Sequence, residues 1–202
     1  MSQDDNPWTT LSREIRYENP WIRVVHHEVL NPRGRPGIYG VVEFRNRAVG
    51  VIPVDQDGCT WLVGQYRFPL GRYSWEIPEG GAPDGASPAE SALRELREET
   101  GLVAGTLMDL VRLDLSNSVT DETGVVFLAT SLTPGPSAPE ETEQLAVRRV
   151  PLGQALAEVM DGRITDSLSV TGLMKLKLLA DAGHLPAGVL ECVRRGLART
   201  GE

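Results

Sequence analysis

The chain has 202 residues, of which 41% are hydrophobic and 24% are charged, and its formal net charge is −8 at pH 7. This length suits one globular domain with a hydrophobic core and perhaps a small appendage, and the composition is ordinary for a soluble protein. The negative charge argues against a nucleic-acid-binding surface, because phosphate backbones are held by Lys and Arg.

Cysteines and apolar runs bear on the compartment. Cys59 and Cys192 lie far apart without metal-ligand spacing, so free thiols in a reducing cytosol are expected, with a disulfide as the alternative. The N-terminus MSQDDNPW is acidic and polar, unlike a signal peptide. No apolar run approaches the roughly 18 residues of a membrane span. We therefore expect a cytoplasmic protein without a membrane partner.

The first half of the chain alternates and turns like β-structure. Four segments are predicted as strands: 21–30, 38–44, 48–54 and 60–66. The first ends at the turn Asn31-Pro32-Arg33-Gly34, and the last two are joined by Asp55-Gln56-Asp57-Gly58, a pattern typical of a β-hairpin.

A Gly- and Pro-rich stretch then leads into a helix predicted from about Pro88 to Thr100. Ser87 supplies an N-cap hydroxyl, Pro88 stands at the first helical position, and Glu90 stands at the third. Apolar residues repeat at helical spacing, and Gly101 ends the helix.

Strands and helices are interleaved in the rest of the chain. Further strands are predicted at 107–115, 124–130 and 146–150, and helices at 151–161, 167–182 and 186–199. The Pro- and Glu-rich segment between the last two of these strands reads as a loop. The interleaving indicates a layered α/β domain.

The predicted helix 88–100 carries three carboxylates close together. Glu95 and Glu99 are four residues apart and share one face, and Glu98 lies beside them. Such like charges repel, but a bound Mg²⁺ makes the interaction favourable because it binds the oxygens of both carboxylates. A solvated face with an Arg94–Glu98 ion pair is the alternative. The Gly-rich loop before the helix favours the metal site, because it places backbone N–H groups where anions bind.

The segment 80–102, GGAPDGASPAESALRELREETGL, resembles the Nudix box G-x5-E-x7-R-E-U-x-E-E-x-G-U, where U is a bulky aliphatic residue. The matching positions are Gly80, Arg94, Glu95, Leu96, Glu98, Glu99, Gly101 and Leu102. Ala86 departs from the pattern, because the family has Glu there. Arg94 thereby lacks its usual partner, so we expect Ala86→Glu to be tolerated and to raise stability or activity modestly.

The resemblance implies a Nudix α/β/α sandwich whose box helix holds Mg²⁺, with Mn²⁺ as a possible substitute. Glu95 and Glu99 would be the principal ligands, Glu98 would assist, and the carbonyl of Glu79 would complete the site. Such ions stabilise charge on a diphosphate, orient it and acidify an attacking water.

The resemblance extends beyond the box. Residues 65–71 and 75–80 are similar to the approach to the box in ADP-ribose and GDP-mannose pyrophosphatases. This implies that Arg67 faces the diphosphate as a bidentate donor and that Gly80 lies in the substrate site. Glu122 resembles part of an acidic pair in the subgroup, and the run 161–167 is also subgroup-like. Asn117 stands where many ADP-ribose pyrophosphatases have Pro, so the class is better defined than the sugar or base.

The N-terminal segment resembles a small β-rich region that members of this subgroup exchange between two subunits. We therefore expect a homodimer, with an N-terminal β-rich dimerisation region over 1–46 and a Nudix hydrolase domain over 47–202. Trp21 and Tyr39 match aromatic residues that sandwich the nucleobase from different subunits. Ordinary packing of strand aromatics is the alternative.

The general base is expected on a loop. In related dimeric enzymes it is a Glu on a mobile loop that closes over substrate. The matching segment, 134–143, offers Glu143 and Glu141 as candidates and Glu140 as the weakest, and Glu98 is next in line. A flexible acidic surface loop is the alternative.

These features predict an enzyme that hydrolyses the diphosphate bond of a nucleoside diphosphate sugar, with ADP-ribose giving AMP and ribose 5-phosphate. GDP-mannose is the nearest rival substrate. Ala86 keeps open a third possibility, a catalytically weak Nudix protein that senses a ligand.

Overall fold

The computed structural model describes residues 5–135 and 145–200. The chain divides into two compact units, and each is described by itself. Unit 1 takes the described residues within 1–47 together with 114–123, and unit 2 takes those within 48–113 and 124–202. No helix in the described part of the chain is long and apolar enough to cross a membrane.

Unit 1 is built on a three-stranded antiparallel sheet in the order β1-β2-β3. Its strands are β1 (Thr9–Glu18), β2 (Ile22–Leu30) and β3 (Pro36–Phe44). The turn between β2 and β3 forms at the predicted place, because the Asn31 side chain accepts the N–H groups of Arg33 and Arg35 at 2.9 and 3.1 Å.

The segment 114–123 joins unit 1 from far along the chain. The Val42 N–H donates to the Val119 carbonyl at 2.9 Å, and the Phe44 N–H donates to the Asp121 carboxylate at 2.8 Å. Nothing in the sequence pattern had predicted this return, because the pairing links residues almost eighty positions apart.

Unit 2 contains two sheets, in the orders β10-β5-β6 and β7-β4-β9-β8. The strands of these sheets are β4 (Asn46–Pro53), β5 (Cys59–Arg67), β6 (Arg72–Glu76), β7 (Glu79–Pro83), β8 (Leu102–Asp114), β9 (Thr123–Pro134) and β10 (Ala146–Pro151). A short 3-10 helix, η1 (Phe68–Leu70), links β5 to β6. The parallel pair β4–β9 is central to the four-stranded sheet.

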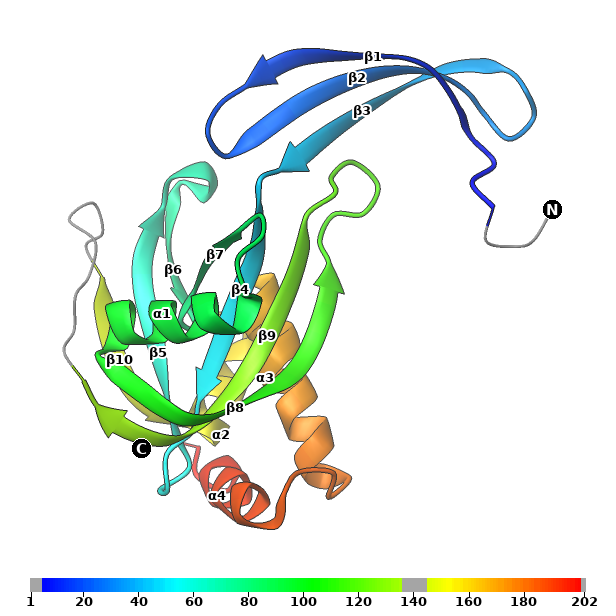
Figure 1. Ribbon diagram of the computed structural model, residues 1–202. Coiled ribbons are helices and arrows are strands. Elements are labelled where there is room, and N and C mark those ends of the chain that lie inside the picture. Colours follow the sequence, from blue (N-terminus) through cyan, green and yellow to red (C-terminus); the bar gives the residue numbers. More distant parts are fainter. Residues whose placement is uncertain (1–4, 136–144, 201–202) are drawn as a thin grey trace. The chain divides into compact units, whose positions relative to one another are not determined.

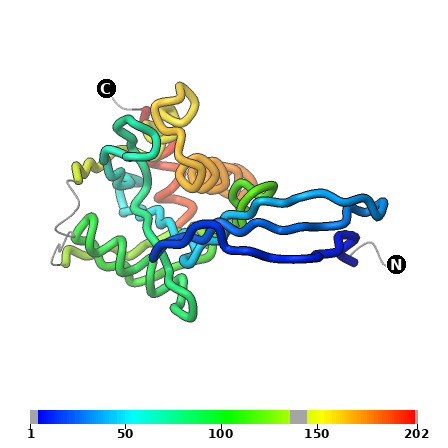
Figure 2. Tube along the Cα trace, turned by 90° about the horizontal axis from the view of Figure 1, so that it is seen from above, coloured from blue at the N-terminus to red at the C-terminus, as the bar shows by residue number. Residues whose placement is uncertain are grey.

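Helices cover both sides of these strands (Figures 1 and 2). The helix α1 (Pro88–Thr100) lies on one side, and α2 (Leu152–Met160) and α3 (Ser167–Asp181) lie on the other, with α4 (Ala187–Leu197) packed against α2. This arrangement confirms the expected α/β/α sandwich.

The alternation of side chains along β4 explains the layers. Val49 and Val51 are fully buried in a core shared with Leu96 of α1, whereas Ile52 lies against Gly172 of α3. Successive residues of a strand point to opposite faces, so a strand buried on both faces reads as a continuous apolar run.

The helix α1 has the bounds that the sequence predicts. The Ser87 hydroxyl accepts the Glu90 N–H at 3.4 Å, and Gly101 adopts a left-handed conformation with φ of 69°. The Gly101 N–H donates to the Arg97 carbonyl at 2.9 Å. Both ends are therefore fixed by local chemistry.

The predicted β-hairpin at 55–58 is wrong. The turn forms, since the Asp55 carboxylate accepts the N–H groups of Asp57 and Cys59, both at 2.9 Å. However, β4 and β5 lie in different sheets. The physical reason is that β7 and β9 occupy both edges of β4 and leave no edge for β5.

Candidate active site

The carboxylates of α1 differ in exposure because the helix buries one face. Leu96 is fully buried against the sheet, and Glu99 is only 7% exposed. Glu95 and Glu98 are half-buried. The Glu99 carboxylate accepts the backbone N–H of Glu79 at 3.0 Å, so it ties α1 to the start of β7.

Arg94 bridges the other two glutamates. It donates to Glu95 at 2.6 Å, to Glu98 at 2.7 Å and to the Gly81 carbonyl at 3.2 Å. Ala86 therefore does not leave Arg94 unpaired, and the reason for expecting a gain from a Glu at position 86 is removed. The Arg94–Glu98 ion pair expected for a solvated helix face is present. However, the same Arg94 also contacts the Gly81 carbonyl in the loop before the helix.

Ala86→Glu is now expected to be nearly neutral. Ala86 is exposed, and Arg94 already has three partners, so the change in unfolding free energy should stay within about 0.5 kcal/mol. Urea denaturation of the variant beside the wild-type protein measures this difference. A stabilisation above about 1 kcal/mol would show that Arg94 exchanges its present partners for the new carboxylate.

The box glycine is required by a close approach. A Cβ atom on Gly80 would overlap the carboxylate of Glu95. Glu95 can therefore lie against the backbone of β7 only because residue 80 has no side chain. Packing against Glu95 thus explains why residue 80 is glycine, and its contact with substrate stays a prediction.

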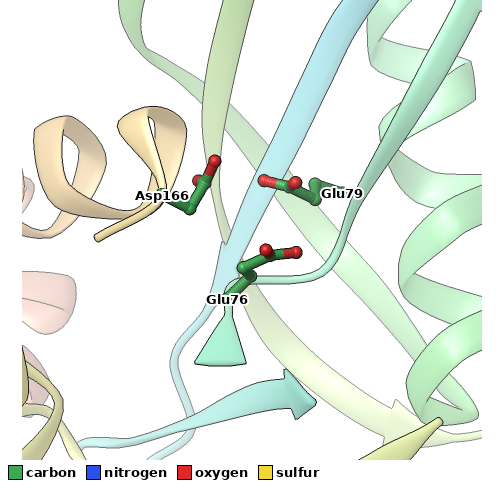
Figure 3. Close-up of side chains that lie close together, drawn as sticks. All are labelled: Glu76, Glu79 and Asp166. Carbon is green, nitrogen blue, oxygen red and sulfur yellow. The ribbon is translucent and has the colours of Figure 1, made fainter. Parts of the chain in front are cut away.

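Next to the box helix, three carboxylates from three elements point toward one another (Figure 3). Glu76 ends β6, Glu79 begins β7 and Asp166 is the N-cap of α3. One oxygen from each lies within 4.8 Å of the others. We call these residues the carboxylate triad. Burial of Glu79, followed by the negative charges of Asp166 and Glu76, raises the pKa of the Glu79 carboxyl well above its usual range.

Arg67, at the end of β5, contacts two members of the triad. Its Nε donates to both Glu76 oxygens at 3.1 and 3.0 Å, and its Nη2 donates to Glu79 at 2.7 Å. Burial alone would lower the pKa of the Arg67 guanidinium, but the hydrogen bond to Glu76 and the charges of Glu79, Glu76 and Asp166 raise it overall. Arg67 therefore stays charged, and its role toward a diphosphate stays a prediction.

The residues present fit a divalent cation. Oε2 of Glu79 is buried, and within residues 5–135 and 145–200 it has no hydrogen-bond partner. A buried carboxylate oxygen without a partner is costly, and a cation is one of the few groups that satisfies it. Carboxylates are also the ligands that Mg²⁺ prefers.

The remaining predicted substrate residues belong to unit 1. Trp21 precedes β2 and is 65% exposed. Tyr39 lies in β3, where its hydroxyl donates to the Ser118 carbonyl at 3.0 Å and its ring meets that of Trp8 edge-on. Glu122 lies in the returning segment 114–123. Their roles toward substrate stay predictions.

The predicted general bases are on a segment that the structure does not describe. Glu140, Glu141 and Glu143 lie outside the described residues. Glu98, the next candidate, is one of the two glutamates that pair with Arg94.

No role was predicted from the sequence for Glu76 or Asp166. Glu76 had one available signal, a charge between the apolar residues Trp75 and Ile77 at the end of a strand. Asp166 was hidden because an Asp just before a helix is already explained as an N-cap, and it does accept the Ser169 N–H at 2.8 Å.

Comparison with known proteins shows the family of the chain. The sequence profile described as the NUDIX domain matches residues 44–167. The profile described as the nucleoside diphosphate sugar hydrolase N-terminal domain matches residues 8–42.

The relatives that match most of the chain include two ADP-ribose pyrophosphatases. An ADP-ribose pyrophosphatase of Mycobacterium tuberculosis is 33% identical over 173 residues, which cover 84% of this chain and 83% of that protein. An ADP-ribose pyrophosphatase of Bacillus subtilis is 32% identical over 171 residues, which cover 84% of this chain and 92% of that protein.

Among solved structures, an ADP compounds hydrolase superposes with a TM-score of 0.80 at 24% sequence identity. The match covers 91% of this chain and all of that chain. At this identity the likeness shows the shared fold.

Proposed function

Because the chain belongs to the NUDIX family, we propose that it hydrolyses the diphosphate bond of a nucleoside diphosphate sugar, with ADP-ribose as the preferred substrate. Water is consumed, and the products are AMP and ribose 5-phosphate. The observation that carries this proposal is that a chain with a box helix rich in carboxylates aligns with two ADP-ribose pyrophosphatases. The alignments cover 83% and 92% of those two proteins.

We assign the metal-holding role to the carboxylates of Glu95, Glu98 and Glu99 of α1 and to the backbone carbonyl of Glu79. Nudix hydrolases generally use divalent metal ions, and Mg²⁺, or Mn²⁺ in its place, suits an all-oxygen ligand set. When bound, such an ion neutralises the diphosphate and lowers the pKa of water. The protein's own contribution is to fix the carboxylates: Glu99 holds the Glu79 N–H, and Arg94 orients Glu95 and Glu98.

Arg67 is proposed to orient the diphosphate. Its guanidinium is one-third exposed although two carboxylates hold it, so it offers a fixed, permanently charged donor at the edge of the site. A guanidinium matches the geometry of phosphate oxygens better than a flexible ammonium does. Proton transfer from the attacking water is assigned to Glu143 or Glu141, which remain predictions from the sequence.

A substrate panel tests the proposal. The protein is incubated with Mg²⁺ and, separately, with ADP-ribose, GDP-mannose, UDP-glucose and NADH, and the released mononucleotide is identified. We expect AMP from ADP-ribose at the highest kcat/KM. GMP released faster from GDP-mannose would move the proposal to that substrate. Binding of ADP-ribose without turnover of any compound would instead identify a ligand-sensing protein.

We further propose that unit 1 forms a homodimer and that Trp21 and Tyr39 of different subunits contact one base. Unit 1 exposes large apolar side chains that a monomer would leave in water: Leu11, Ile15, Tyr17, Trp21 and Ile38. In addition, β1 is an edge strand of its sheet, and exposed edge strands favour pairing with another chain.

Light scattering measures the predicted assembly. We expect a mass of about twice 22.0 kDa for the wild-type protein. Ile15→Asp should shift the mass toward one chain, because it places a charge among the exposed apolar residues of β1. Leu178→Asp is the matched control, since Leu178 is an exposed apolar residue of α3 in unit 2. A wild-type monomer with full activity would contradict the shared base site.

A further inference from the structure

The fold, rather than flexible surface side chains, brings the carboxylate triad together. Between Glu76 and Glu79, the fully buried Ile77 donates its backbone N–H to the Ser169 hydroxyl at 2.9 Å. Ser169 is itself fully buried in the first turn of α3, three residues after the cap residue Asp166. The link between β6 and β7 is thereby fastened to the helix end that carries Asp166.

The charges of the triad are not balanced by Arg67. Three carboxylates face one guanidinium, which contacts Glu76 and Glu79. Glu76 is only 3% exposed, so water screens these charges poorly. Like charges held this close in a partly buried site require a proton or a cation to offset them.

One ligand position is already defined. Oε1 of Glu79 accepts from Arg67 at 2.7 Å, whereas the buried Oε2 has no hydrogen-bond donor among the residues that the structure describes, and the side chain lies against the Asp166 carboxylate. Figure 3 shows that the Glu79 carboxylate points toward Asp166 and Glu76. The carboxylate that carries the oxygen without a donor thus faces the other two carboxylates.

We propose that Glu76, Glu79 and Asp166 bind a divalent cation of the Mg²⁺ and Mn²⁺ class, separate from the ion held by the glutamates of α1. The inference rests on the proposed function only for the use of this ion in hydrolysis. Mg²⁺ binds oxygens at about 2.0–2.1 Å, so ligand atoms on one ion lie about 3–4 Å apart. The triad oxygens, within 4.8 Å of one another, need only a small closure.

The site adjoins the box helix and the predicted phosphate donor. The Glu79 N–H donates to Glu99 at 3.0 Å, so a ligand of the triad and a ligand of the box are tied by one hydrogen bond. A cation on the triad would take over part of the charge that Arg67 now offsets. The guanidinium would then be available to the diphosphate.

Manganese binding without nucleotide tests the proposal. The protein is titrated with Mn²⁺, free Mn²⁺ is followed by electron paramagnetic resonance, and affinity is measured by calorimetry. Asp166→Asn retains an oxygen that can cap α3, so its fold should persist. We expect it to lose one bound Mn²⁺ or to bind that ion at least tenfold more weakly. Glu79→Gln should behave in the same way.

Asp161→Asn is the matched control, because Asp161 is an exposed carboxylate of the same α2–α3 connection, paired with Arg163. It should bind Mn²⁺ like the wild-type protein. Unchanged number and affinity of bound ions in both Asp166→Asn and Glu79→Gln would overturn the proposal. It would also be overturned if Glu99→Gln and Asp166→Asn abolished the same single ion, since the triad would then belong to the box site.

This test is independent of the substrate panel. Loss of a Mn²⁺ ion in Asp166→Asn together with no hydrolysis of any nucleotide would sink the proposed function and leave the cation site standing. Hydrolysis of ADP-ribose with unaltered Mn²⁺ binding in both triad variants would do the reverse.

Discussion

Glu99→Gln is expected to lower kcat for ADP-ribose by about 100-fold or more without unfolding the protein. The substitution removes a negative charge from the box helix, which weakens the proposed hold on a divalent ion. A Gln side chain keeps an oxygen that can accept the Glu79 N–H, so the link between α1 and β7 is preserved. Steady-state kinetics at saturating Mg²⁺ and a thermal melt measure the two effects separately.

Glu90→Gln provides the control for this experiment. Glu90 is an exposed carboxylate in the first turn of the same helix, so its variant should keep near-native turnover. A Glu99→Gln protein that retained the wild-type rate at saturating Mg²⁺ would refute the assignment of Glu99 to the metal site.

Leu96→Ala is expected to destabilise the protein by about 3 kcal/mol. Leu96 is fully buried between α1 and the strands β4 and β9, where it packs in one cluster with Val51 and Phe127. Ala is a strong helix former, so the loss reflects the cavity rather than the helix. At about 3 °C per kcal/mol for a chain of this size, the melting temperature should fall by about 9 °C.

The matched control is Leu178→Ala on α3. Leu178 is 62% exposed, so its truncation should change the unfolding free energy by less than about 0.5 kcal/mol. Equal losses in the two variants would mean that α1 is not anchored through its apolar face, contrary to the packing described above.

The box helix could be predicted from sequence because its determinants are local. Ser87 and Gly101 fix its ends within one turn, and apolar residues at helical spacing fix the face that is buried. The shared face of Glu95 and Glu99 follows from the same geometry. For such an element, the sequence pattern and the packing give the same answer.

Strand pairing was harder to predict from the sequence, because it depends on which edges of a sheet are free. The turn after Asp55 was predicted correctly, but its consequence was not: β4 already has two neighbours, so β5 enters another sheet. In the same way, the contact of Val42 with Val119 joins distant segments that carry no local signal of one another.

The carboxylate triad shows the same limit at the site. Glu76 and Glu79 are close in sequence, but Asp166 comes from a helix end almost ninety residues later. Hydrogen bonds from the Ile77 N–H to the Ser169 hydroxyl and from Arg72 to the Thr165 hydroxyl hold this helix end near β6. Ala86 leaves Arg94 without the family's usual partner, but the carboxylates of Glu95 and Glu98 on its own helix take that place.

Hydrolysis of ADP-ribose in water enriched in heavy oxygen tests the central claim most directly. With Mg²⁺ present, we expect AMP and ribose 5-phosphate in equal amounts, with heavy oxygen in the phosphate of one product only, because water attacks one phosphorus of the diphosphate. Release of ADP and free ribose, or recovery of intact ADP-ribose, would contradict cleavage of the diphosphate bond by this protein.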